Sequence, residues 1–239
     1  MSPLLSWHAG PLQHALRQRA HALLVHGQSG LGQLEFGLAF ARASLCEAEA
    51  EADGRPCARC AGCRLMEARA HPDFHLLVPE ALRLALGWAD EAEDGDGAKA
   101  RKPSREIRVE AVRDAIAWAQ NTPSRGRGKL VLIHPAQAMN AVTANALLKT
   151  LEEPPASLRL VLTATDPELL LPTIRSRCQR LRLPAPDRAQ ALAWLQGQGI
   201  EGAEVLLAAA DGRPLDVVEL VRDGVDAGRW AALPRRIAR

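Results

Sequence analysis

The chain has little that would tie it to a membrane or, through its overall charge, to nucleic acid. No uninterrupted apolar run approaches the roughly 20 residues that span a bilayer. Residues 1–10 lack the basic start and apolar core of a signal peptide. The 30 basic and 28 acidic residues leave a net charge of only +2, so bulk charge makes no case for nucleic-acid binding. We therefore expect a cytoplasmic protein with no membrane partner.

A second absence concerns a glycine-rich turn that would otherwise bind nucleotide. Gly27 and Gly32 have the spacing of a phosphate-binding loop and follow a short apolar run. Such a loop needs a lysine for the β- and γ-phosphates and a hydroxyl for Mg²⁺, but Gln33 and Leu34 occupy those positions. The segment predicts the shape of a nucleotide site without its ligands.

The acidic half of that site is missing as well. A P-loop ATPase holds Mg²⁺ with an acidic residue at the end of a second buried strand. The apolar run 129–133 continues instead into His134 and Pro135, and neither offers a carboxylate. The lysine, the hydroxyl and both acidic residues of an ATP site are therefore replaced. We expect a chain that does not hydrolyse ATP and has no ATP cofactor.

Short apolar runs alternate with helical patterns through the first 184 residues. The runs predict strands at 22–26, 74–78, 129–133, 158–162 and 179–183. Helical patterns lie between them at 31–45, 109–120 and 140–151. Alternation of this kind builds a parallel sheet with helices on both faces, so residues 1–184 are predicted to form an α/β domain.

Beyond residue 184 the pattern is wholly helical. Asp187 is a candidate cap for a helix that reaches about residue 198, and helical stretches follow at 203–210 and 215–222. A small helical domain is therefore expected over residues 185–227.

One stretch fits neither pattern. Residues 87–106 are polar and rich in acidic residues and glycine. This composition is typical of a solvated, mobile insertion rather than of an acidic binding site.

Four of the five cysteines form the pattern C-x10-C-x2-C-x2-C, at Cys46, Cys57, Cys60 and Cys63. The x2 spacing lets thiolates converge on one ion, and four sulfurs satisfy tetrahedral Zn²⁺. Disulfides are disfavoured without an export signal, and no redox context supports an iron–sulfur cluster. Free buried cysteines are a third alternative. We expect a structural zinc module over residues 46–63 and a buried thiol at Cys178.

Arg177 stands in a Ser-Arg-Cys tripeptide just before the last predicted strand. An arginine at a domain edge can reach a neighbour's γ-phosphate and stabilise transition-state charge in trans. The alternative is an ordinary surface salt bridge, which the tripeptide alone would favour.

Taken together, these features resemble the delta prime family of bacterial DNA polymerase III clamp-loader subunits, which are AAA+ proteins. Besides the degenerate loop and the cysteines, the resemblance rests on His-Pro-Asp at 71–73, on 144–155 and on 176–178, in the family's order. The run Leu-Leu-Lys-Thr-Leu-Glu-Glu-Pro-Pro within 144–155 is specific to clamp-loader subunits. The match extends from about residue 23 to about residue 220.

The resemblance implies a P-loop-type, RecA-like α/β domain with a zinc-binding insertion, a three-helix lid and a C-terminal collar. Residues 228–239 would be the start of a collar that is missing or truncated. Arg177 matches the family's arginine finger, and the four cysteines match its zinc ligands. The lid position of the family's nucleotide-sensing arginine is occupied by Leu215, with Arg213 close by.

The function implied is that of a non-hydrolysing component of DNA polymerase III, a DNA-directed DNA polymerase. Its arginine would serve a neighbouring gamma/tau ATP site while the sliding clamp is loaded on primed DNA in replication. The implied partners are the gamma/tau and delta subunits and, through the complex, the clamp and primer-template DNA.

Two alternatives stay open. The first is an active AAA+ motor subunit of the gamma/tau kind, in which Gln33 is tolerated and the magnesium ligands come from elsewhere. The second is a free-standing zinc-binding DNA adaptor, which rests on the cysteines with Arg125, Arg127 and Lys129. Basic residues that flank glycines are more often part of a solvated turn.

Overall fold

The computed structural model describes residues 4–18, 20–49, 56–88 and 102–237, with the backbone alone for 233–237. Most of the expected insertion at 87–106 lies outside the described residues. Within these ranges no helix is long and apolar enough to cross a bilayer.

Five strands form one parallel sheet in the order β2-β3-β4-β1-β5. Their bounds are β1 (Ala22–His26), β2 (Phe74–Leu77), β3 (Lys129–Ile133), β4 (Leu158–Ala164) and β5 (Gln179–Arg182). All five predicted strands are present, and the parallel sheet is confirmed. Because the strands are parallel, their carboxyl ends meet at one edge of the sheet and their amino ends at the other.

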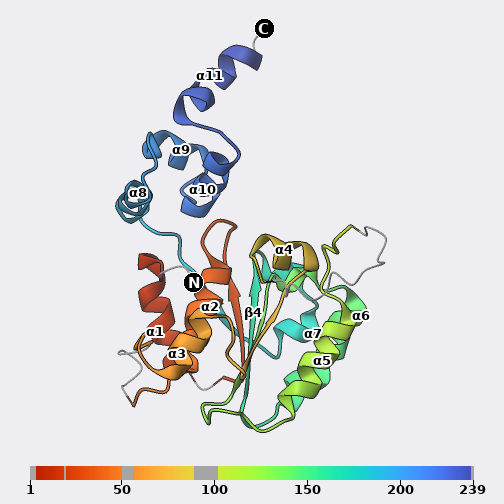
Figure 1. The fold of residues 1–239 in the computed structure, drawn as a ribbon. Helices are drawn as coiled ribbons and strands as arrows, with labels where there is room; N and C mark the ends of the chain where they lie inside the picture. The colour runs from red at the N-terminus through yellow and green to blue at the C-terminus, as the bar shows by residue number, and fades with distance from the viewer. Residues whose placement is uncertain (1–3, 19, 50–55, 89–101, 238–239) are drawn as a thin grey trace, which may run out of the picture.

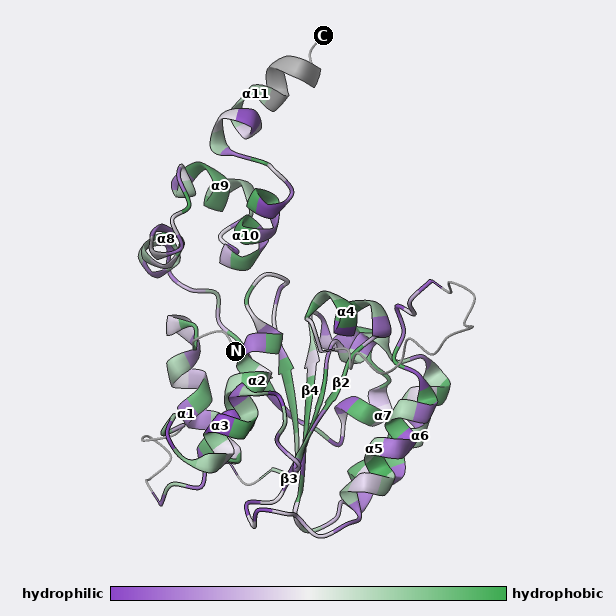
Figure 2. Cartoon of the chain, viewed as in Figure 1, coloured by the Kyte–Doolittle hydropathy of each residue, from purple (hydrophilic) through white to green (hydrophobic). Residues whose placement is uncertain are grey.

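Helices cover both faces of the sheet, as predicted (Figure 1). One face carries α1 (Ala9–Arg17), α2 (Gln33–Ser44) and α3 (Ala61–Glu67), and the other carries α5 (Val109–Ala119), α6 (Ala141–Glu152) and α7 (Pro172–Arg175). In β1, Leu23 and Val25 belong to the first apolar layer, whereas Ala22 and Leu24 belong to the second. This alternation follows from the two-residue period of a strand. The inner strands β1, β3 and β4 are accordingly apolar, whereas the edge strand β5 buries only Leu181. The covering helices are amphipathic (Figure 2).

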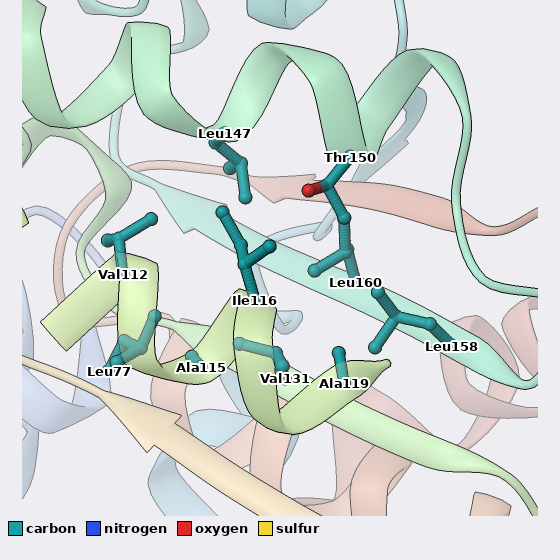
Figure 3. A pocket seen from close by; sticks show the side chains of 10 residues that line it. All are labelled: Leu77, Val112, Ala115, Ile116, Ala119, Val131, Leu147, Thr150, Leu158 and Leu160. Atoms are coloured by element: carbon teal, nitrogen blue, oxygen red, sulfur yellow. The ribbon is translucent and has the colours of Figure 1, made fainter. Parts of the chain in front are cut away.

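Short elements complete the sheet region. The 3₁₀ turns are η1 (Ser6–His8), η4 (Ala136–Ala138) and η5 (Pro167–Leu169), and the short helix α4 (Glu80–Ala85) follows β2. A gap of about 10 Å³ lies between α5, α6 and the sheet. Apart from Thr150 its lining is apolar, with Ile116 and Leu147 facing each other across it (Figure 3). A water needs at least two polar partners, so this gap is a packing feature and not a ligand site.

Three further helices form the small lid, as predicted: α8 (Arg188–Gly197), α9 (Ala203–Ala209) and α10 (Pro214–Arg222). They enclose an apolar cluster of their own, centred on Leu195, Leu206 and Val217. Asp187 begins α8 with a reciprocal capping box. Its carboxylate accepts from the backbone N–H of Gln190, and the Gln190 side chain accepts from the backbone N–H of Asp187. The last helix, α11 (Ala227–Ile237), follows the lid. The domain boundaries at 184 and 227 stay predictions.

Candidate nucleotide loop, cysteine cluster and interface arginine

The glycine-rich loop follows β1 at the carboxyl edge of the sheet, where phosphate-binding loops of α/β proteins lie. Gly30 and Gly32 have φ values of +72° and +88°, a left-handed conformation that glycine adopts without the strain of a Cβ atom. Gly32 immediately precedes α2 as its N-cap. The backbone features of a phosphate loop are therefore present.

The side chains in the loop are turned toward the protein itself. The Gln33 amide donates from Nε2 to the carbonyl oxygens of Gly27 and Gln28, the latter at 2.7 Å, and the side chain is buried. Leu34 is buried in the apolar layer that includes Phe36. The loop therefore has no lysine ammonium for the phosphates at Gln33 and no hydroxyl for Mg²⁺ at Leu34.

His134 lies at the end of β3, where a magnesium-binding carboxylate would be expected. Its Nδ1 atom is 2.7 Å from the hydroxyl of Thr163, which is fully buried. Burial lowers the pKa of His134 to about 4, so the ring is neutral at neutral pH. A neutral imidazole lacks the anionic oxygen that Mg²⁺ prefers.

The N-terminal turn η1 brings two rings against the same loop. Trp7 Nε1 and His8 Nε2 both donate to the carbonyl of Leu31, at 3.0 and 2.8 Å. The Trp7 ring also packs edge to face against Trp194 of α8, with the ring centres 5.6 Å apart. Burial lowers the pKa of His8 to about 4. These buried rings connect the loop to the lid.

Helix α10 is fastened directly to the loop through a set of contacts that we name the lid latch: Ser29, Gly30, Arg213, Leu215 and Asp216. Arg213 Nη1 donates to the Ser29 hydroxyl at 2.7 Å and pairs with Asp216 at 2.8 Å. The Leu215 backbone N–H donates to the Gly30 carbonyl at 3.2 Å. A Cβ atom on Gly30 would lie 2.3 Å from an Asp216 oxygen, so the approach is as close as glycine allows. The lid is thus held by the protein's own groups.

The four cysteines of the predicted module converge. Their sulfur atoms all lie within 4.8 Å of one another, and those of Cys46 and Cys60 are 3.9 Å apart. Zn–S bonds of about 2.3 Å place the sulfurs of a tetrahedral site about 3.8 Å apart, so the spacing fits a four-thiolate metal site. The 50–55 part of the module lies outside the described residues.

Backbone groups around the cluster favour thiolates, whereas burial raises the pKa of the Cys63 thiol to about 12. The N–H groups of Cys57, Cys60 and Cys63 each donate to a neighbouring cysteine sulfur at 3.4 Å. The N–H groups of Arg59 and Cys60 hold the pKa of the Cys57 thiol at about 6. All five cysteines are described, and all are free of disulfides. Cys178 is buried, as predicted, and burial raises the pKa of its thiol to about 12.

Basic residues near the cluster are engaged in holding the module. Arg125 pairs with the Glu47 carboxylate, and Arg127 donates to the Glu47 carbonyl at 2.9 Å. Asp73 anchors the same loop by accepting from the backbone N–H of Arg125 at 2.8 Å. Lys129 is buried and donates to a helix-end carbonyl. The three basic residues behind the DNA-adaptor alternative therefore have structural partners.

Arg177 lies between α7 and β5, at the amino edge of the sheet. Its Nη1 donates to the Thr173 carbonyl at 2.9 Å and its Nη2 to the Glu152 carboxylate at 2.5 Å, and the side chain is one-third exposed. Leu23 pairs with Gln179 in register, whereas the glycine loop follows the far end of β1. The arginine and the loop are thus separated by at least about 10 Å of strand.

The chain matches the family model described as "DNA polymerase III, delta subunit" over residues 11–187. It is 38% identical to the DNA polymerase III subunit delta' of Pseudomonas aeruginosa, over 87% of this chain and 58% of that protein. It is 35% identical to the delta' subunit of Escherichia coli, over 79% and 50%. The chain thus spans between half and two-thirds of the length of these relatives.

Other similarities extend beyond the delta' subunits. The tau subunit of Salmonella typhimurium is 31% identical over 87% of this chain and 30% of that protein. A DNA polymerase III gamma-subunit-related protein of Thermotoga maritima superposes with a TM-score of 0.53 at 19% identity, covering 89% of this chain and 58% of that one. A RuvB variant of the same organism gives 0.51 at 13% identity, covering 90% and 59%. These two structures bear on the fold alone, which is that of AAA+ proteins.

Proposed function

The chain belongs to the delta prime family of DNA polymerase III clamp-loader proteins, and from this premise we propose that it is a non-hydrolysing ring subunit. Arg177 serves the ATP site of a neighbouring tau/gamma subunit. The proposed partners are the tau/gamma and delta subunits and, through the complex, the sliding clamp and primer-template DNA. A cytoplasmic location follows from that role.

The position of Arg177 is the observation that carries this proposal. It lies at the edge of the sheet opposite the chain's own nucleotide loop, so it does not serve that loop. A subunit that meets a neighbour edge to edge brings such an arginine to the neighbour's loop. There the guanidinium stabilises charge that develops on the transferred phosphoryl group.

The state of the chain's own loop supports the absence of ATP binding and hydrolysis. Gln33 supplies no cation for the phosphates, Leu34 supplies no hydroxyl for Mg²⁺, and His134 is a neutral ring. The lid latch joins the loop to the lid through the protein's own side chains. These features oppose the alternative of an active tau/gamma-like motor.

The cysteine cluster is proposed to hold one structural Zn²⁺, with all four sulfurs as ligands. Four thiolates complete a tetrahedral shell and leave no open position for a substrate, so the ion has no catalytic role. Its work is to fix the segment between α2 and α3 against the sheet.

The deciding experiment reconstitutes the ring with Arg177→Ala and the tau/gamma, delta, clamp and primed-DNA components of the same organism. Fingers of this kind contribute on the order of 10³-fold or more in GTPase systems, so hydrolysis at the adjoining site should fall steeply. Total turnover falls less, because the other ATP sites keep their arginines. Titration calorimetry of the chain alone with Mg-ATP should show no micromolar binding.

Normal hydrolysis at the adjoining site in the Arg177→Ala ring would return Arg177 to a surface salt bridge. Micromolar binding of Mg-ATP to the isolated chain would favour the motor alternative instead.

A further inference from the structure

The guanidinium of Arg177 is not free in the isolated chain. Its two terminal nitrogens are each tied to an acceptor of the same chain, Nη1 to the Thr173 carbonyl and Nη2 to the Glu152 carboxylate. Glu152 is the last residue of α6. A carboxylate at a helix C-terminus is unfavourable beside the negative end of the helix dipole, and the arginine offsets this.

The two acceptors differ in what they do to an arginine that must bind a phosphate. The Thr173 carbonyl is neutral, so it orients one end of the guanidinium and leaves its charge intact. Glu152 is negatively charged and occupies donors on the other terminal nitrogen. Its charge would also repel a phosphate brought to the same guanidinium. Glu152 and the phosphate are therefore competitors for Arg177.

We propose that Glu152 is a positioning residue that holds Arg177 on its own chain until the phosphates of a neighbour's nucleotide displace it. This inference rests on the proposed function of Arg177. On engagement, Nη2 passes from Glu152 to the phosphate while Nη1 keeps the Thr173 carbonyl. The arginine thus keeps one hydrogen bond while it changes the other, so its side chain stays ordered before it binds the phosphate.

The size of the effect follows from the exposure of the pair. The Glu152 side chain is half exposed and that of Arg177 one-third exposed. Ion pairs in such settings hold their partners by about 1.5- to 5-fold in equilibrium constant, and salt screens them. Glu152 is therefore a weak competitor for Arg177, and a nucleotide phosphate displaces it readily.

The test uses complete rings in which only the ATP site beside Arg177 is competent. Glu152→Ala should raise kcat/KM for ATP at that site about 1.5- to 5-fold at low salt, and Glu152→Gln, which removes the charge but keeps the shape, should act in the same direction. Both gains should shrink at high salt and disappear in an Arg177→Ala background. A residue with a merely structural role would not produce a gain that depends on Arg177.

The matched control is Glu168→Ala, which breaks the neighbouring pair between Glu168 and Arg175 and should leave kcat/KM unchanged. If Arg177→Ala is defective but Glu152→Ala leaves kcat/KM unchanged or lowers it, the inference is wrong and the finger assignment stands. If Arg177→Ala itself leaves hydrolysis normal, the proposed function fails and the inference with it.

Discussion

The nucleotide loop and the cysteine cluster are both candidate ligand sites, but their donor groups are arranged in opposite ways. In the loop the Gln33 amide donates to the loop's own carbonyls, and the lid latch connects the loop to the lid. In the cluster four sulfurs surround one centre and receive hydrogen bonds from the backbone behind them. A site is recognised by the donors that are left for a ligand, not by the backbone shape that once presented them.

The largest effect expected concerns the cluster. Structural Zn²⁺ contributes about 10–16 kcal/mol of binding free energy in zinc-finger peptides, energy that is coupled to local folding. Cys60→Ala should reduce bound zinc from one per chain to near zero. Hydrogen exchange should then rise in 46–63 while the sheet stays protected, because the module is attached to the sheet by surface ion pairs and backbone contacts.

Metal analysis by mass spectrometry measures the first effect, with Cys178→Ala as the control that keeps its zinc. If Cys60→Ala kept its full zinc content, or if the native protein held no zinc, the cluster would not be the metal site proposed. The contrast between the cysteine cluster and the nucleotide loop would then be wrong.

A second effect tests how tightly the loop region is closed. His8 is fully buried, its Nε2 donates to Leu31, and its Nδ1 has no hydrogen-bond partner among the described residues. Burial lowers its pKa from 6.5 to about 4, so the unfolded chain binds a proton more readily. The stability that this provides is complete above about pH 6.5 and is lost as the pH falls through 4. The loss is about 3 kcal/mol by proton linkage.

Urea unfolding at pH 7 and at pH 4.5 measures most of this loss. His8→Gln should make the free energy of unfolding less dependent on pH. A remainder should come from the other histidines whose pKa values are lowered by burial, which are His26, His71, His75 and His134. Equal pH dependence in native protein and His8→Gln would show that the turn η1 admits water.

The smallest effect concerns the lid latch. Arg213→Ala removes the ion pair with Asp216 and the hydrogen bond to Ser29, which should lower the local stability of α10 by about 1 kcal/mol. Hydrogen exchange of α10 should accelerate about fivefold. Arg229→Ala breaks a more exposed pair of the same i,i+3 spacing, with Asp226 outside α10, and should leave α10 unchanged.

Added Mg-ATP should not restore the lost protection in Arg213→Ala. If nucleotide restored the protection of α10, the loop would still bind nucleotide. The loop and the cluster would then both be ligand sites, and the contrast drawn between them would be wrong.

Much of the fold could be predicted because it is encoded locally. The five strands follow from short apolar runs. The cap at Asp187 follows from its place directly before the helical pattern, and its partner Gln190 is only three positions away. The helices that were missed are α1, α3, α4, α7 and α11. Helix α1 starts with glycine and proline at its second and third positions and is held by packing on α2, and α4 has no buried residue to give it a pattern.

The candidate sites divide in the same way. The altered loop and the four cysteines could be found from spacing alone, since their groups lie close together in the chain. The roles of Trp7, His8 and Asp216 could not, because each depends on a distant segment. The contact between Ser29 and Asp216, for example, joins residues 187 positions apart. Nothing local in the sequence marks such partners.

The remote position of Arg177 has a consequence for gene dosage. Its side-chain hydrogen bonds within the described part of the chain go to Thr173, Ser176 and Glu152, so its loss should leave the sheet, the lid and the zinc module intact. Under the proposed function, a variant chain without it would compete with the normal chain for the same place in the ring. In a cell that makes both, the share of impaired rings would follow the share of variant chains, and the normal copy would not mask the defect.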